Sequence, residues 1–151
     1  LISEINYGSR DNTRRPIAWT NEQNNSFGFT AGKPWLQMPT RASEINLQND
    51  LLSQKSIFKF YKELLKLRKD NFVIRRGEFI DLTNGQNDCF IFKRALDNQS
   101  FITVCNFKNK KEITLPKELL NNGYSLVLMN YPSRKDFSPA FEPFEVAIYK
   151  K

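Results

Sequence analysis

The spacing of the apolar residues changes once along this chain, near Gly77, and that change limits the folds open to it. Between residues 54 and 70 the apolar side chains recur at steps of three and four, which is the spacing of one helix face. After Gly77 they recur at every second position, which is the spacing of a strand with one buried face. The sequence therefore predicts one amphipathic helix followed by a series of short strands.

The predicted helix covers residues 54–70. Ser53 is its predicted N-cap, Asn71 is a residue that ends helices, and the cations of the last turns offset the negative helix end. Two further apolar residues widen the stripe, so we expect the helix to be covered on two sides. The apolar residues are Ile57, Phe58, Phe60, Tyr61, Leu64, Leu65 and Leu67.

Six short strands are predicted, at residues 78–82, 89–95, 100–106, 112–115, 124–130 and 144–149. Asn84-Gly85 and Asp97-Asn98 are hairpin turns between them. A helical turn at residues 116–122, closed by Gly123, separates two of the strands. In the last strand Phe144, Val146 and Ile148 alternate with Glu145 and Tyr149, so the apolar residues are expected to form one buried face. Short strands joined by tight turns favour an antiparallel sheet folded over as a sandwich.

Composition excludes several kinds of chemistry. The chain has 151 residues, no histidine and two cysteines. Without histidine it lacks Ser-His-Asp and Cys-His catalysis and nearly all zinc sites, so we expect no metal and no cofactor. Cys89 and Cys105 lie in apolar runs and are expected to be buried free thiols in the cytoplasm, with a disulfide between neighbouring strands as the alternative.

The composition and charge distribution also limit the classes of partner that the chain could bind. The net charge of +7 is spread along the chain, which does not favour nucleic acid. No apolar run reaches the roughly 18 residues of a membrane span. No signal peptide and no initiating methionine are visible at Leu1, so the chain starts as if cut from something longer.

Residues 1 to about 50 are predicted to be irregular, and they contain the segment with the most binding chemistry. Residues 9–19 read Ser-Arg-Asp-Asn-Thr-Arg-Arg-Pro-Ile-Ala-Trp. Aspartate, asparagine and proline disfavour a helix or strand here, so this segment is a loop. A loop dense in guanidinium groups, with an indole beside it, can grip a polar, multi-hydroxyl or anionic ligand. The alternative is a solvated loop whose charges pair with each other.

Several segments resemble the α-glucosidase branch of glycoside hydrolase family 13. Residues 9–19 are similar to the family signature S-R-D-N-x-R-T-P-M-Q-W. Residues 27–35, Phe-Gly-Phe-Thr-Ala-Gly-Lys-Pro-Trp, are similar to A-G-F-T-T-G-x-P-W, and Glu44-Ile45-Asn46 is similar to K-E-I-N. The predicted helix resembles the last barrel helix, and residues 143–149 resemble the final strand of the C-terminal domain. The resemblance covers the chain from Ser9 to its end.

This resemblance implies a mainly β chain that holds the last loop and helix of a (β/α)8 barrel, in residues 1–72. An antiparallel β-sandwich C-terminal domain would follow in residues 73–151. The family's catalytic carboxylates precede this chain, so no catalytic residue is expected here. The resemblance gives substrate binding to Arg14 and Arg10. Asp11, Asn12 and Trp19 are expected to brace the loop.

The function implied is that of the C-terminal fragment of a retaining α-glucosidase acting on short oligosaccharides, α-1,6-glucosides such as isomaltose above all. Its expected partners are the oligosaccharide and the missing N-terminal barrel, and the fragment alone should be inactive. Arg15, where the family has threonine, leaves a trehalose-6-phosphate hydrolase fragment as an alternative. A non-catalytic carbohydrate-binding sandwich is another, with Phe90, Phe92 and Phe101 as its aromatic row.

Overall fold

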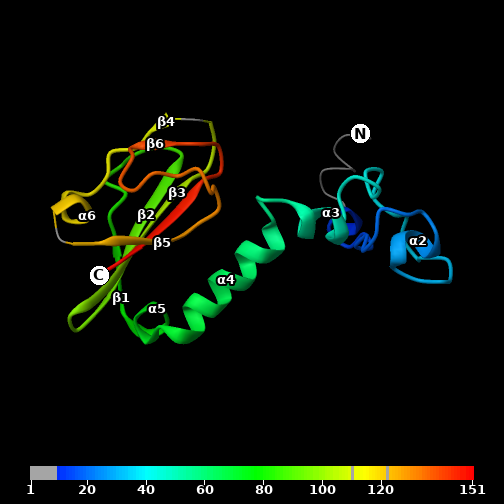
Figure 1. Ribbon diagram of the computed structural model, residues 1–151, viewed down its shortest axis with the longest axis horizontal. Coiled ribbons are helices and arrows are strands. Elements are labelled where there is room, and N and C mark those ends of the chain that lie inside the picture. Colours follow the sequence, from blue (N-terminus) through cyan, green and yellow to red (C-terminus); the bar gives the residue numbers. More distant parts are fainter. Residues whose placement is uncertain (1–9, 110, 122) are drawn as a thin grey trace. The chain divides into compact units, whose positions relative to one another are not determined.

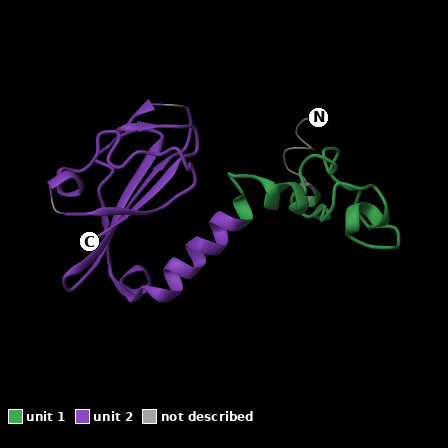
Figure 2. Ribbon diagram, viewed as in Figure 1, with its two compact units in different colours: residues 1–58 green, residues 59–151 purple. Residues whose placement is uncertain are grey.

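The computed structural model describes residues 10–109, 111–121 and 123–151. The chain divides into two compact units, residues 1–58 and residues 59–151, which Figure 2 colours separately. The family-based boundary between residues 72 and 73 concerns domains of the parent enzyme, and it stays a prediction.

The first unit is mostly loop, as the sequence predicts. Its regular elements are one 3-10 turn, η1 (Arg10–Thr13), and two short helices, α2 (Asn25–Gly28) and α3 (Leu47–Leu52) (Figure 1). Its buried residues are few, and Ala18, Ala42 and Asn46 are among them. Such a small core means that hydrogen bonds between loop segments determine the shape of this unit.

Helix α4 (Ile57–Asp70) begins three residues later than predicted, and Ser53 is not its N-cap. Ser53 instead ends α3, where its N–H donates to the Asp50 carbonyl. The carboxylate of Asp50 caps α4, because it accepts hydrogen bonds from the backbone N–H groups of Ile57 at 2.9 Å and Phe58 at 3.0 Å. Asn71 ends the helix as predicted, and its side-chain amide donates to the Leu67 carbonyl.

The second unit is built on a five-stranded antiparallel sheet with the strand order β1-β2-β3-β7-β5. Asn84 and Gly85 have positive φ angles of 51° and 71°, as a tight turn of the predicted kind requires. The strands of this sheet are β1 (Glu78–Asp81), β2 (Cys89–Leu96), β3 (Gln99–Asn106), β5 (Ser125–Met129) and β7 (Val146–Lys150).

Two short strands and two short helices accompany this sheet. β4 (Lys111–Glu112) pairs with β6 (Ala140–Phe141) in a separate two-stranded ladder. The predicted strand 112–115 is thus reduced to its first residue, although Ile113 and Leu115 are still buried. The helices are α5 (Phe72–Arg76) and α6 (Lys117–Asn121), the latter within the predicted helical turn.

The sheet is covered on both faces. On one face the main core joins Ile91, Ile102 and Val104 of the sheet to Phe141 of β6 and Leu119 of α6. On the other face a smaller cluster joins Phe101 and Ile148 to Val73 of α5, with Leu64 and Leu67 of α4 packed against it. The predicted antiparallel sheet is confirmed. The expectation that α4 is covered on two sides is not met in this structure, because Leu64 and Leu67 pack on the sheet whereas Phe58 and Leu65 are exposed.

Strand β7 corrects one prediction. It lies inside the sheet between β3 and β5, so its residues are buried toward both faces, and Tyr149 is fully buried. Glu145, expected on a polar exposed side, is also buried and forms an ion pair with Arg134 at 2.9 Å. Phe144, predicted to point inward, precedes the strand and is exposed.

The two cysteines are free, and no disulfide joins them. Cys89 lies opposite Asn106 and Cys105 lies opposite Phe90, so the two side chains point to opposite faces of the sheet. Cys89 is buried as predicted, whereas Cys105 is only half-buried. Burial raises the pKa of the Cys105 thiol to about 11.

Candidate functional site

The arginine-rich loop of the first unit is fixed at both ends of its exposed segment. On the η1 side the Arg14 N–H donates to the Asp11 carbonyl at 3.1 Å. On the other side Pro16 and Ala18 are buried. Arg14 and Arg15 lie between these anchors, and both side chains are exposed. The loop therefore presents two adjacent guanidinium groups to solvent from a backbone that is held in place.

The backbone of Trp19 is held from two directions. Its N–H donates to the Phe27 carbonyl at 2.8 Å, and the carbonyl of Trp19 accepts from the N–H of Gln48 at 3.0 Å. The neighbouring carbonyl of Ala18 accepts from Leu47 at 3.1 Å. Segments about ten and thirty residues away thus meet at the backbone of Trp19.

Asn46, in the same unit as the arginine-rich loop, has a structural role that was not predicted from the sequence: it is the N-cap of α3. It is buried, its side-chain amide donates to the carbonyls of Ala42 and Ser43 at 3.0 Å each, and its Oδ1 caps α3 by accepting from the Asn49 N–H. The signal was present, because asparagine before an apolar helix is a common N-cap. Asn46 therefore positions α3, the helix to which the Trp19 segment is bonded.

Helix α2 is a left-handed turn. Asn25, Ser26 and Phe27 have φ angles of 46°, 52° and 57°, and Gly28 follows at 75°. Only the glycine adopts this region without steric cost. The turn is held by the bonds that the Trp19 and Thr20 N–H groups donate to the Phe27 carbonyl, so its geometry is tied to the end of the arginine-rich segment.

A hollow of about 220 Å³ lies beside this loop, lined by Asp11, Arg15, Leu36 and Gln37. It brings together one of the predicted bracing residues and the arginine next to Arg14. Its volume is below the roughly 300 Å³ at which small-molecule pockets usually start. By itself the hollow is therefore smaller than a usual small-molecule pocket.

The predicted site residues are placed as follows. Arg14 is exposed and is not part of the lining of this hollow. Asp11 is exposed, and Trp19 is exposed over about half of its surface. Arg10 and Asn12 lie on η1, and their side chains fall outside the described part of the structure.

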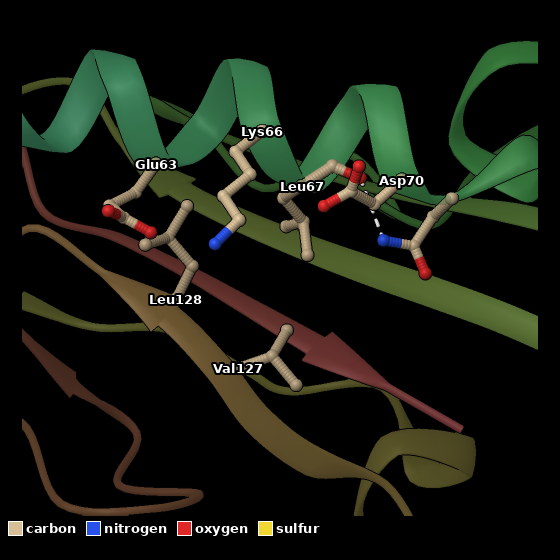
Figure 3. Close-up of a pocket in the computed structure, with 7 residues that line it drawn as sticks. Glu63, Lys66, Leu67, Asp70, Val127 and Leu128 are labelled. Carbon is tan, nitrogen blue, oxygen red and sulfur yellow. Dashed lines mark hydrogen bonds between the residues drawn. The ribbon is translucent and has the colours of Figure 1, made fainter.

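A second hollow, of about 170 Å³, lies in the second unit between α4 and β5 (Figure 3). Glu63, Lys66, Leu67 and Asp70 project in a row from α4, while Val127 and Leu128 project from β5. Asn71 closes one end, and its Oδ1 accepts from Lys150 Nζ at 3.1 Å. Because Leu67 and Leu128 belong to the smaller core cluster, this hollow is a seam between helix and sheet.

A third hollow, of about 310 Å³, lies at the α6 side of the sheet. The ion pair of Lys93 and Glu118, at 3.0 Å, lies on its wall together with a buried hydrogen bond of 2.6 Å between the hydroxyls of Ser100 and Tyr124. These contacts tie α6 to the sheet, so we assign them a structural role, although the second carboxylate oxygen of Glu118, Oε1, is buried without a hydrogen-bond partner in the described part of the structure.

The described residues contain neither a cluster that could hold a metal ion nor a helix that could span a membrane. Within residues 10–109, 111–121 and 123–151, no three His, Cys, Asp or Glu side chains are grouped where they could hold a metal ion. None of the helices in this part of the chain has the length and apolar character needed to cross a bilayer.

Comparison with known families decides which family this loop belongs to. The family model described as "Alpha amylase, catalytic domain" matches residues 2–77, which is half of the chain and includes the whole arginine-rich loop. The chain belongs to the alpha-amylase family. The match ends at Gly77, the residue at which the sequence changes from helical to strand spacing.

Similar proteins of this family are known from several bacteria. An oligo-1,6-glucosidase of Halalkalibacterium halodurans is 30% identical over 99% of this chain. A trehalose-6-phosphate hydrolase of Escherichia coli is 30% identical over 96% of it. The crystal structure of Bacillus licheniformis trehalose-6-phosphate hydrolase superimposes on 94% of the chain with a TM-score of 0.79 and 29% identity.

This alpha-amylase family chain spans only about a quarter of the length of these relatives. It covers 27% of the H. halodurans protein and 26% of each of the other two.

Proposed function

We propose that this chain is the C-terminal part of a retaining α-glucosidase that hydrolyses α-glucosidic bonds in short oligosaccharides, with α-1,6-linked glucosides such as isomaltose as its substrates. The observation that carries the proposal is Arg14. Its side chain is exposed on a loop with a fixed backbone, and no described residue pairs with it. An exposed, unpaired guanidinium on a backbone that is held in place is suited to bind a carboxylate and sugar hydroxyls that come from outside the chain.

In the proposed enzyme, the residues that carry out the reaction precede residue 1. Retaining hydrolysis needs two carboxylates about 5–5.5 Å apart, one as nucleophile and one as acid and base. In our proposal the preceding barrel segment supplies both. Arg14 holds the glucosyl unit against that segment, Arg10 assists, and Asp11, Asn12 and Trp19 keep the loop in shape. Residues 1–72 complete the barrel, and residues 73–151 form the β-sandwich.

Exposed apolar side chains in the first unit and on α4 support a missing barrel segment. Trp35 is 86% exposed, and Ile17, Ile57 and Tyr61 are each exposed over more than half of their surface. Large apolar groups exposed in this number usually mark an interaction surface. In the proposed enzyme they pack against the preceding barrel segment.

The test is a pair of substitutions in the complete enzyme. Arg14→Lys keeps the charge but loses the planar fork, and Arg14→Ala loses both. We expect kcat/KM on an aryl α-glucoside to fall by about 100-fold or more for Arg14→Ala. In the complete enzyme, the carboxylate proposed to bind Arg14 would then be buried without its counter-charge. Arg41→Gln, which breaks an exposed ion pair with Glu44, is the control and should leave kcat/KM unchanged. Equal activity of Arg14→Ala and the control would refute the assignment.

A second candidate substrate is a phosphorylated disaccharide such as trehalose 6-phosphate. Arg15 favours it, because this exposed arginine lines the hollow beside the loop together with Gln37. Comparing kcat/KM for trehalose 6-phosphate and isomaltose distinguishes the two, and Arg15→Thr should lower only the former. We place the enzyme in the cytoplasm, and the two unpaired thiols support that placement.

A further inference from the structure

Helix α3 holds the carbonyl groups at the end of the arginine-rich loop (Figure 1). The N–H of Leu47 donates to the Ala18 carbonyl at 3.1 Å, and the N–H of Gln48 donates to the Trp19 carbonyl at 3.0 Å. Leu47 and Gln48 are the first two residues of α3, and N–H groups at the start of a helix have no partner inside it. The start of α3 therefore supplies two of the bonds that fix the loop backbone.

Asn46 determines where α3 starts. Its backbone is extended, with φ of −150° and ψ of 166°, and its Oδ1 accepts from the Asn49 N–H at 2.9 Å. The side-chain amide of Asn46 donates to the carbonyls of Ala42 and Ser43, so the cap itself is anchored in a buried position. Because an N-cap residue sets the first turn of a helix, Asn46 also sets the direction of the two N–H groups that hold the loop.

The chain between Ala18 and Arg14 has little freedom to absorb a shift. Three residues lie between them, and one of these is Pro16, whose ring fixes φ and which is buried, as is Ala18. On its other side, the Arg14 N–H donates to the Asp11 carbonyl at 3.1 Å. A displacement of the Ala18 carbonyl is therefore transmitted to the backbone of Arg14.

We propose that Asn46 is a positioning residue for Arg14. It places α3, α3 holds the carbonyls of Ala18 and Trp19, and the loop fixed in this way aims the Arg14 guanidinium at the glucosyl unit. This inference rests on the proposed function, because it needs Arg14 to bind the substrate. Asn46 acts on the reaction only through the loop and makes no contact with the sugar.

The first test removes one hydrogen bond from the complete enzyme. Leu47→Pro deletes the N–H that donates to Ala18, and proline is tolerated at the first position of a helix and after an extended residue such as Asn46. Leu47→Ala loses the leucine side chain but keeps the N–H, so it is the matched control. We expect kcat/KM on an aryl α-glucoside, per mole of folded enzyme, to fall by about tenfold for Leu47→Pro and by less than about twofold for Leu47→Ala.

The second test changes Asn46 itself. Asn46→Ala removes the cap and should lower kcat/KM by about tenfold, whereas Asn46→Ser keeps a capping oxygen and should restore most of the activity. Asn106→Ala is the control, because Asn106 is also buried and its side-chain amide also donates to two carbonyls, but it lies in the second unit. It should lower the stability of the enzyme and leave kcat/KM of the folded enzyme within about twofold.

Combination with Arg14→Ala separates positioning from a general loss of structure. Without the guanidinium there is nothing to position, so Leu47→Pro and Asn46→Ala should lower kcat/KM by less than about twofold in that background. Equal reductions with and without Arg14 overturn the inference, and so does a Leu47→Pro enzyme as active as Leu47→Ala. If Asn46→Ala does not fold, the two Leu47 variants decide the question.

The outcomes also separate this inference from the proposed function. An enzyme whose kcat/KM is unchanged by Arg14→Ala refutes the proposed function and the positioning role together. An enzyme that loses activity with Arg14→Ala, but not with Leu47→Pro or Asn46→Ala, keeps the proposed function and overturns only the role of Asn46.

Discussion

The second unit contains a buried ion pair between Arg134 and Glu145, and we expect the free energy of unfolding of this unit to depend strongly on it. Their side chains are 1% and 3% exposed, and they meet at 2.9 Å. Arg134 also donates to the carbonyls of Ser138 and Ala140, while the second oxygen of Glu145 accepts from the Glu142 N–H at 2.7 Å. Replacing Glu145 with leucine removes the only carboxylate that the structure shows at Arg134, among the residues described.

The expected loss is large, because the guanidinium would remain buried without its counter-charge. Removing one partner of a buried pair costs about 3–5 kcal/mol. For a domain of under 100 residues, a loss of about 3 kcal/mol lowers Tm by roughly 12–24 °C. Replacing both partners, as in Arg134→Met with Glu145→Leu, should cost less than Glu145→Leu alone, since no charge is then left buried.

Urea unfolding followed by far-UV circular dichroism measures these changes. Tryptophan fluorescence is unsuitable, because both tryptophans, Trp19 and Trp35, belong to the first unit. Glu112→Leu, on the exposed position of β4, is the control and should change the free energy of unfolding by less than about 0.5 kcal/mol. A loss below about 1 kcal/mol for Glu145→Leu would show that the reasoning about the buried charge is wrong.

Three further predictions follow from single contacts. Asp50→Ala should destabilise the start of α4 by about 1–2 kcal/mol, measured by urea unfolding, because the Ile57 N–H loses its cap. Gly77→Ala should destabilise the second unit more than a surface change does, since the added Cβ would lie 2.5 Å from the Val73 carbonyl oxygen. The Cys105 thiol, with its pKa raised by burial from 9.0 to about 11, should react slowly with iodoacetamide at pH 8 until the chain unfolds. Its contribution to stability should be present below pH 9 and disappear as the pH rises toward 11, which unfolding curves at several pH values would reveal.

Local patterns were sufficient to predict most of the sheet and the main helix. Asn84-Gly85 predicts a turn because both residues tolerate positive φ, and the structure has both there. Helix spacing predicted α4 to within three residues at its start. Such features depend on residues close together in the sequence, which is why a single sequence contains them.

Features that depend on distant partners were missed. Glu145 has the spacing of an exposed strand residue, and its burial depends on Arg134, eleven positions earlier in an irregular loop. Asp50 caps a helix that begins seven residues later, beyond the range of the usual capping patterns. In the candidate site, the binding role of Arg14 stays a prediction, because no described residue pairs with its guanidinium.

The left-handed turn at α2 bears on the local stability of the first unit. Its three non-glycine residues with positive φ each cost about 1–2 kcal/mol of backbone strain in isolation. Local preference therefore opposes the turn. It is held by the bonds from Trp19 and Thr20 to Phe27 and by the bonds that the N–H groups of Gly28, Phe29 and Thr30 donate within the turn. We therefore expect this turn to be among the parts of the unit that open on mild heating.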